Sequence, residues 1–186
     1  MSTYKVLDGN GLGQYVYGLG SGASGDPLRL VSKRYSNALV EDGKIFTFAP
    51  RFSLANNAVL NYLIKTPATP KVTIYQIDCS ADNAPVMHDL YESTAVSANG
   101  TAVTPFNNNR TSATAAATLI YSGPTVTSTG TALISDMVIG GKAAGGQDQG
   151  EFRLILAPST NYLLQITQSS GNATANITFY FKFAET

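Results

Sequence analysis

Short segments in which polar and apolar residues alternate follow one another along the chain from about Leu28 onward. Alternation with a period of two is typical of half-buried β-strands. The clearest case is 71–78, where Val72 and Ile74 fall on one face and Tyr75 and Ile77 on the other. The pattern predicts strands at 44–49, 58–65, 71–78, 86–93, 118–121, 152–157, 162–167 and 177–183.

Turn residues such as Gly, Pro and Asn separate these segments every ten to fifteen residues, roughly as expected for short antiparallel strands. No segment of a dozen residues keeps a helical period, so we expect helix only as a turn, at 113–117. Glu41-Asp42-Gly43 is read as a hairpin turn. The last strand carries Phe179, Phe181 and Phe183 on one face, which predicts a core stripe. Eight or so such strands predict an all-β fold, a single antiparallel β-sandwich or jelly roll over residues 28–186.

An internal similarity links two segments thirty residues apart. Residues 94–103 and 124–133 both contain a Val, a hydroxyl residue and then Gly-Thr-Ala followed by an aliphatic residue. Each copy predicts a short strand, a Gly turn and a returning strand. Two copies are too few for a solenoid. We interpret them as equivalent hairpins at one end of the sandwich.

The first 27 residues differ in composition from the rest, because they are rich in glycine interleaved with large side chains. So much glycine raises the entropic cost of ordering the backbone, so this segment is not expected to fold alone. One interpretation is a disordered terminus. The other is an extended N-terminal arm, 1–27, which orders on a neighbouring subunit through Tyr4, Leu12, Tyr15 and Tyr17.

The charged fraction of the chain is low, at 13%, and twelve basic residues balance twelve acidic ones. A neutral surface attracts neither nucleic acid nor an anionic membrane, so we expect neither as a partner. It also protects poorly against self-association, which suits a protein whose surface is covered in an assembly. The single cysteine, Cys79, excludes an intramolecular disulfide, and the chain opens without an apolar leader. We expect a soluble protein made in a reducing compartment.

The residues that carry most enzyme chemistry are scarce in this sequence. His88 is the only histidine, and its alternation with Val86 and Leu90 favours a packed core or edge histidine. No Gly-x-Ser-x-Gly elbow occurs, and one histidine with one cysteine cannot form a usual catalytic zinc site. The carboxylates are scattered, and the chain has no Trp as a sugar platform. The sequence therefore predicts no enzyme activity, no cofactor and no metal site.

One polar tract is a candidate for partner binding. Asn107, Asn108 and Asn109 are followed by Arg110. Asparagine tolerates left-handed backbone and bonds to its own main chain, so the tract can simply shape a turn. Alternatively, Arg110 can reach a carboxylate of a partner through two parallel hydrogen bonds.

Three pieces of the second half of the chain occur in one order: the Asn tract with Arg110, the piece 124–131 and the stretch 155–164. Together they resemble a set of structural proteins of tailed bacteriophages, and the resemblance covers residues from about Asn99 to the C-terminus. At 157–160, Ala-Pro-Ser-Thr stands where the family pattern suggests a Lys-Pro-Asn-Thr type of turn. Members resemble capsid decoration, or cement, proteins. The resemblance implies a β-sandwich on the outer capsid surface, bound to the major capsid protein and commonly assembled as a homotrimer.

The expected localisation is therefore the virion, with assembly in the host cytoplasm. Two other classes remain open at this stage. A tail-fibre, baseplate or adaptor component shares the all-β composition rich in Gly, Asn and Thr, although the chain has no fibrous stem. A carbohydrate-binding jelly roll needs exposed aromatic platforms, which ten Tyr permit but the absence of Trp disfavours.

Overall fold

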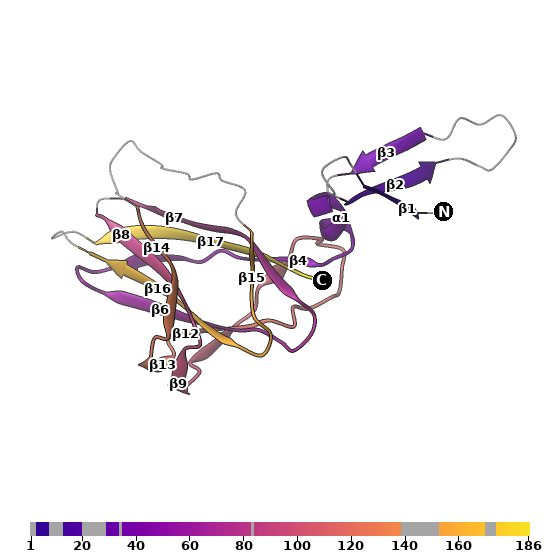
Figure 1. Cartoon of the computed structure of the whole chain (residues 1–186). Coiled ribbons are helices and arrows are strands. Elements are labelled where there is room, and N and C mark those ends of the chain that lie inside the picture. The colour runs from indigo at the N-terminus through magenta and orange to yellow at the C-terminus, as the bar shows by residue number, and fades with distance from the viewer. Residues whose placement is uncertain are drawn as a thin grey trace, which may run out of the picture.

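The fold is taken from a computed structural model of the chain. The structure describes residues 35–82, 84–138, 153–169 and 174–186 in full, and describes the backbone of residues 3–7, 13–19 and 29–33. The described strands are antiparallel and form two stacked sheets, a small ribbon and a separate N-terminal sheet (Figure 1). The prediction of an all-β antiparallel sandwich is confirmed.

The first large sheet, which we call the β17 sheet, has the order β11-β4-β17-β7-β15, with β5 also paired to β17. Its strands are β4 (Ile45–Phe48), β5 (Arg51–Leu54), β7 (Val72–Ala81), β11 (Phe106–Asn107), β15 (Leu154–Ile155) and β17 (Ala175–Glu185). The second, the β16 sheet, has the order β10-β12-β6-β16-β8-β14. Its strands are β6 (Val59–Lys65), β8 (Val86–Glu92), β10 (Thr101–Val103), β12 (Leu119–Ser122), β14 (Thr131–Val138) and β16 (Asn161–Gln168).

The main core fills the space between the two sheets. Phe179, Phe181 and Phe183 are fully buried in it, as the alternation in the sequence predicted. Phe48 of the β17 sheet meets Tyr62 of the β16 sheet edge-on, with ring centroids 4.9 Å apart. Full burial of one such side chain contributes about 1.5–3 kcal/mol, so the aromatic stripe is a major source of stability.

The helix in the structure lies where none was predicted. Helix α1 spans Tyr35–Glu41, whereas residues 113–117 contain no helix. Gly43, at φ +67°, ends α1: its N–H donates to the Val40 carbonyl, and the Lys44 N–H donates to the Leu39 carbonyl, both at 2.9 Å. This pair of bonds is a Schellman motif. Residues 41–43 are therefore a helix end rather than the expected hairpin turn. The sequence did not predict this helix because seven residues are too few to show a helical period.

Residues 113–117 are held in an irregular path by a buried carboxylate. The Glu185 side chain accepts hydrogen bonds from the backbone N–H groups of Ala117 and Thr118, at 2.9 and 2.7 Å. The carboxylate thereby pairs two backbone donors that no strand partner satisfies. The Ala-rich segment can therefore stay extended without leaving these N–H groups unpaired. Local helix propensity is thus overridden by a contact with the last strand.

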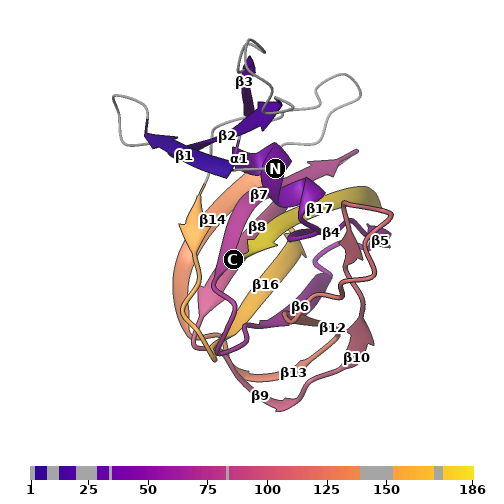
Figure 2. The ribbon, with the colours of Figure 1, turned by 90° about the vertical axis from the view of Figure 1, so that its right-hand side faces the viewer.

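The N-terminal region contains a three-stranded antiparallel sheet, β1 (Thr3–Leu7), β2 (Gly13–Leu19) and β3 (Arg29–Lys33). These strands pair with one another and with no described strand of the sandwich. Figures 1 and 2 show them beyond α1, away from the two large sheets. The predicted N-terminal arm thus contains strands of its own, and the small sheet includes residues on both sides of residue 27.

A two-stranded ribbon forms a third layer. It consists of β9 (Ala95–Ala98) and β13 (Thr125–Ser128), and we call it the β9–β13 ribbon. The interpretation of 94–103 and 124–133 as hairpins is wrong, because β9 pairs with β13, β10 with β12 and β14 with β8. Each Gly turn instead leads the chain from the ribbon into an edge strand of the β16 sheet (Figure 2).

The pairing of the strands has an internal pseudo-two-fold symmetry. Its axis relates β8–β9–β10 to β12–β13–β14, with residue numbers that differ by 30, and β5–β6–β7 to β15–β16–β17, with numbers that differ by 100. Equivalent residues face each other at the axis: Leu63 pairs with Leu163, Cys79 with Phe179 and Val96 with Val126. The tripeptide Asn61-Tyr62-Leu63 recurs as residues 161–163.

Candidate binding surfaces

Asn107 is a structural residue. Its side chain is buried, its Nδ2 donates to the carbonyls of Gly43 and Thr114 at 2.8 and 3.0 Å, and its Oδ1 accepts from the Asn109 N–H at 2.9 Å. Three of the four hydrogen bonds that an amide side chain can make are therefore used inside the protein. Asn107 fastens the end of α1 to the loop that follows β11.

The next two asparagines also bond within the fold. Thr47 donates its hydroxyl to Asn108 Oδ1 at 2.7 Å, and Asn109 Nδ2 donates to the Glu41 carbonyl at 2.8 Å. Asn109 Oδ1 also accepts from the N–H of Thr111 at 3.1 Å. The shaped-turn interpretation therefore accounts for the bonding of these side chains.

Arg110 is the member of the tract that is open to solvent. Its guanidinium carbon lies 5.9 Å from the ring centroid of Phe106, which is 45% exposed. A guanidinium over an aromatic face is attracted to it and is held in place without losing its hydrogen-bonding capacity. Arg110 and Phe106 thus present an oriented cation next to an exposed apolar ring.

The N-terminal candidates are placed only in part. Tyr4 lies in β1, and Tyr15 and Tyr17 lie in β2, where Tyr4 pairs with Val16 in the backbone register. Leu12 lies outside the described residues. The structure therefore puts the three tyrosines in one small sheet, far along the chain from the Asn tract.

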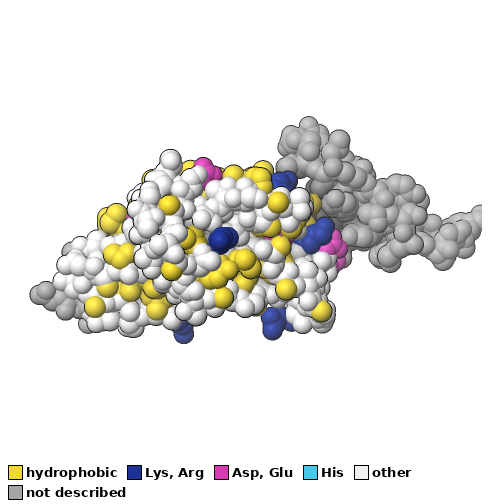
Figure 3. Space-filling view, turned by 90° about the horizontal axis from the view of Figure 1, so that it is seen from below, with side chains coloured by type: hydrophobic (Ala, Val, Ile, Leu, Met, Phe, Trp, Pro, Cys, Tyr) yellow, Lys and Arg dark blue, Asp and Glu magenta, His cyan; other side chains and the backbone are white. Residues whose placement is uncertain are grey.

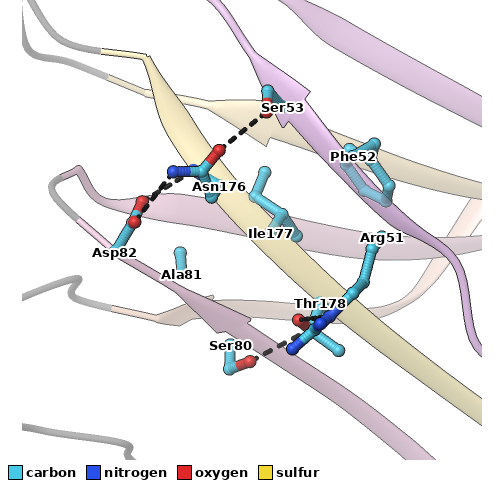
Figure 4. Close-up of a pocket in the computed structure, with 9 residues that line it drawn as sticks. All are labelled: Arg51, Phe52, Ser53, Ser80, Ala81, Asp82, Asn176, Ile177 and Thr178. Atoms are coloured by element: carbon cyan, nitrogen blue, oxygen red, sulfur yellow. Dashed lines mark hydrogen bonds between the residues drawn. The ribbon is translucent and has the colours of Figure 1, made fainter.

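A hollow of about 570 Å³ opens on the outer face of the β17 sheet (Figure 4). Strands β5, β17 and β7 form it, and sequence reasoning did not single it out because its residues are common ones from three distant segments. The lining residues are Arg51, Phe52, Ser53, Ser80, Ala81, Asp82, Asn176, Ile177 and Thr178.

The polar groups of this hollow bond to one another in two rows across the strands (Figure 4). In one row Ser53 donates to Asn176 Oδ1 at 2.7 Å, and Asn176 Nδ2 donates to Asp82 at 2.9 Å. The bond from the Asn176 side chain, with a further one from the Asn176 backbone N–H, lowers the pKa of Asp82. In the other row Arg51 and Ser80 donate to Thr178, at 3.3 and 3.4 Å. Neither serine hydroxyl is bonded to a base, so the rows provide no activated nucleophile.

A second hollow, of about 490 Å³, lies where the loop after β6 meets the last residues of the chain. Its walls are mainly apolar and are rich in proline. The lining residues are Thr66, Pro67, Ala68, Thr69, Pro70, Lys71, Val72, Leu156, Pro158 and Thr186. They include no histidine, cysteine or carboxylate side chain, so they offer apolar contact rather than chemistry.

His88 is a buried histidine, as predicted. It is 5% exposed, and its Nδ1 has no hydrogen-bond partner among the residues that the structure describes. Burial lowers its pKa, against the opposing effect of the carboxylates of Asp136 and Asp89. A neutral, buried imidazole on the core face of β8 has no access to a substrate in solution, so it serves the fold.

The side of the molecule that carries the β9–β13 ribbon is nearly free of charge. Arg110 is the only charged residue between Glu92 and Asp136, a stretch that includes β9, β10, β12 and β13. Figure 3 shows this side covered mainly by uncharged side chains, with Lys and Arg appearing singly. The stretch with a single charged residue is visible in the sequence, but only the fold places its strands on one side of the molecule.

Among the residues described, no group of three or more His, Cys, Asp or Glu side chains is placed to hold a metal ion. The described part of the chain also has no helix of sufficient length and apolarity to cross a membrane. Comparison with protein-family models, with curated proteins and with solved structures found no match to the chain.

Proposed function

We propose that this chain is a non-enzymatic virion structural protein that binds the outer surface of a tailed-phage capsid and stabilises the shell. The observation that carries the proposal is the uncharged side of the sandwich, which joins the β9–β13 ribbon to the exposed edges of the β16 sheet. The resemblance of residues from about Asn99 onward to phage decoration proteins falls largely on this region.

A surface of this kind is suited to burial in an assembly. Removing charged groups from water is costly unless each finds a partner, whereas a small hydroxyl side chain needs only one hydrogen bond and an aliphatic one needs none. Leu119 of β12 and Leu133 of β14 are large apolar residues that are 49% and 40% exposed on this sheet. Covering them removes apolar surface from water and so contributes to binding.

The direct test is co-sedimentation with undecorated capsids of the phage that encodes the chain. We expect the protein to pellet with capsids to saturation and to raise their melting temperature, because a ligand that binds only the assembled shell stabilises it by mass action. A protein that stays in the supernatant at micromolar concentration would contradict the proposal.

The proposal includes a homotrimer and a binding role for residues 1–27. Light scattering is expected to give three times the 19.6 kDa of one chain, and a constant single-chain mass on dilution would contradict this. A truncation that starts at Asp26 is expected to keep the melting temperature of the sandwich and to bind capsids more weakly. Equal binding by the truncated and full-length proteins would remove the arm from the proposed interface.

A further inference from the structure

The β9–β13 ribbon shows the same surface twice. Residues 91–98 and 121–128 have the same sequence of exposed, half-buried and buried positions, residue by residue. Exposed Ala95, Ser97 and Ala98 on β9 correspond to exposed Thr125, Thr127 and Ser128 on β13, which are also small and uncharged. The pseudo-two-fold axis passes between Val96 and Val126, which pair with each other.

The axis also runs through the sheet beneath. Leu63 and Leu163 pair at the centre of the β16 sheet and are 0% exposed. They are not part of the main core, which instead contains their neighbours Tyr62 and Tyr162. Because successive residues of a strand face opposite sides, both leucines lie on the face away from that core. Figures 1 and 2 show the ribbon on this side, and we infer that it shields the two leucines. The ribbon is therefore a supported platform, centred on the axis.

The ribbon has two open edges, and they too are equivalent. In the described part of the chain, β9 pairs only with β13, so each strand keeps one edge of backbone N–H and carbonyl groups unpaired by another strand. Open edges without Lys or Pro readily accept contact from another chain. Neither strand contains a charged residue or a proline.

We propose that the ribbon docks on two identical capsid-protein subunits related by an exact or local two-fold axis, one contacting β9 and the other β13. A surface that repeats about an axis can make the same contacts with each member of a two-fold pair, whereas a single partner would use only half of it. The absence of charge on both strands requires an equally uncharged partner surface, since a charged one would lose its hydration without compensation. The inference rests on the proposed function, and it adds the geometry of the partner.

The test uses equivalent substitutions on the two strands. Ser97→Lys and Thr127→Lys each place a charge on one half of the ribbon, and the double variant places one on both. Ser80→Lys is the matched control: Ser80 is also exposed on a strand and donates to a carbonyl of the neighbouring strand at 3.4 Å, as Ser97 does at 3.5 Å. Affinity is measured by co-sedimentation with undecorated capsids, and the melting temperature of each variant establishes that it is folded.

We expect each single ribbon variant to weaken binding by a similar factor, about tenfold, and the double variant by about the product, because separate contacts add in free energy. Ser80→Lys is expected to bind as the unmodified protein does. Cryo-electron microscopy of decorated capsids should place the ribbon over a two-fold axis of the lattice.

Three outcomes would overturn the inference in distinguishable ways. If the unmodified protein does not bind capsids, the proposed function fails and the inference fails with it. If it binds but only one of Ser97→Lys and Thr127→Lys weakens binding, or neither does, the function stands and two-fold docking is wrong. If the ribbon variants instead abolish self-association, the ribbon is an interface between copies of this chain.

Discussion

The segments β8–β9–β10 and β12–β13–β14 follow the same path through the molecule and yet differ at their ends. Near the pseudo-two-fold axis they agree closely: Gly100 and Gly130 have φ values of +89° and +87°, and Val96 pairs with Val126. At the sheet edges they diverge, because β10 has three residues and β14 has eight. Positions near the axis are constrained by close backbone packing, whereas the edges face solvent and tolerate change.

The long edge strand β14 carries two features that its short equivalent lacks. Its register shifts between Ala132 and Ile134, and the exposed Asp136 lies opposite His88 in the register. A β-bulge and a charged side chain on an edge strand both discourage a sheet edge from adding another strand. The β14 edge therefore resists strand addition through both its charge and its bulge. The β9–β13 ribbon also has register shifts, on both sides of Val126, but its strands carry no charge.

The most severe test of the comparison is the pair of glycines. A Cβ at Gly100 would collide with the Ser122 carbonyl oxygen, and one at Gly130 with the Glu92 carbonyl oxygen, which is the equivalent atom. We expect Gly100→Ala and Gly130→Ala each to lower the free energy of unfolding by about 3 kcal/mol, because strain at positive φ adds to a backbone clash. Urea denaturation measures the loss.

Gly123→Ala is the control for the glycine variants. Gly123 also has positive φ, at +67°, but a Cβ there would meet nothing within 4 Å, so only the conformational cost of about 1 kcal/mol is expected. Equal losses in all three variants would show that backbone conformation alone, and not the close approach at the axis, sets the cost.

The next test compares two tyrosines at equivalent positions. Tyr162 donates its hydroxyl to Glu92 at 2.6 Å and accepts from the Ala157 N–H at 2.7 Å, whereas Tyr62 is hydrogen-bonded to the Ser122 side chain. We expect Tyr162→Phe to cost about 2 kcal/mol, since it leaves a carboxylate and a backbone donor without their partner, and Tyr62→Phe about 1 kcal/mol.

Titration provides a second reading of the same pair. Burial, with the bond to Glu92, raises the pKa of Tyr162 to about 12, and burial raises that of Tyr62 as well. Ultraviolet titration should therefore show neither tyrosine ionising near pH 10 while the protein is folded. Equal stability losses in the two Phe variants would contradict the unequal hydrogen bonding.

A pH-dependent difference is expected at His88. Its pKa is lower in the folded protein than the unfolded value of about 6.5, so the neutral form is favoured by folding. The contribution of neutral His88 to the free energy of unfolding is fully present above pH 6.5. It is lost as the pH falls, by about 1.4 kcal/mol for each pH unit between the two pKa values. His88→Gln should show a shallower decline in unfolding free energy between pH 7 and 5; parallel curves would contradict the assignment.

The smallest effect is expected at Thr118, the residue equivalent to His88. Its hydroxyl is buried and has no hydrogen-bond partner among the described residues, so Thr118→Val should raise the stability by up to about 1 kcal/mol. Thr94→Val is the matched control, because the Thr94 hydroxyl is buried and donates to the Thr129 carbonyl at 2.7 Å. Thr94→Val should lower the free energy of unfolding, measured by chemical denaturation, by about 1 kcal/mol. A higher free energy of unfolding in both variants would show that burial of the hydroxyl, and not its hydrogen bonding, sets the stability.

The candidate site residues illustrate what local sequence can predict. The Asn tract was expected either to shape a turn or to bind a partner, and the contacts of Asn107 with Gly43 and Thr114 show that its amide is used within the fold. Those partners lie far away or across an irregular loop, so no spacing rule could have identified them. The hollow of Arg51, Asp82 and Asn176 was missed for the same reason, since three strands from distant parts of the chain meet there.

The sequence by itself determined where most strands lie and which of their faces are buried, because alternation is a local property that repeats every second residue. Segments 71–78 and 177–183 became β7 and β17 with Phe179, Phe181 and Phe183 in the core. Only the tertiary structure decided which strand pairs with which. The similar segments around Gly100 and Gly130 look like two hairpins locally, yet their strands pair across the pseudo-two-fold axis and form the ribbon instead. Hydrogen bonding and burial between distant strands outweigh the preference of a single turn.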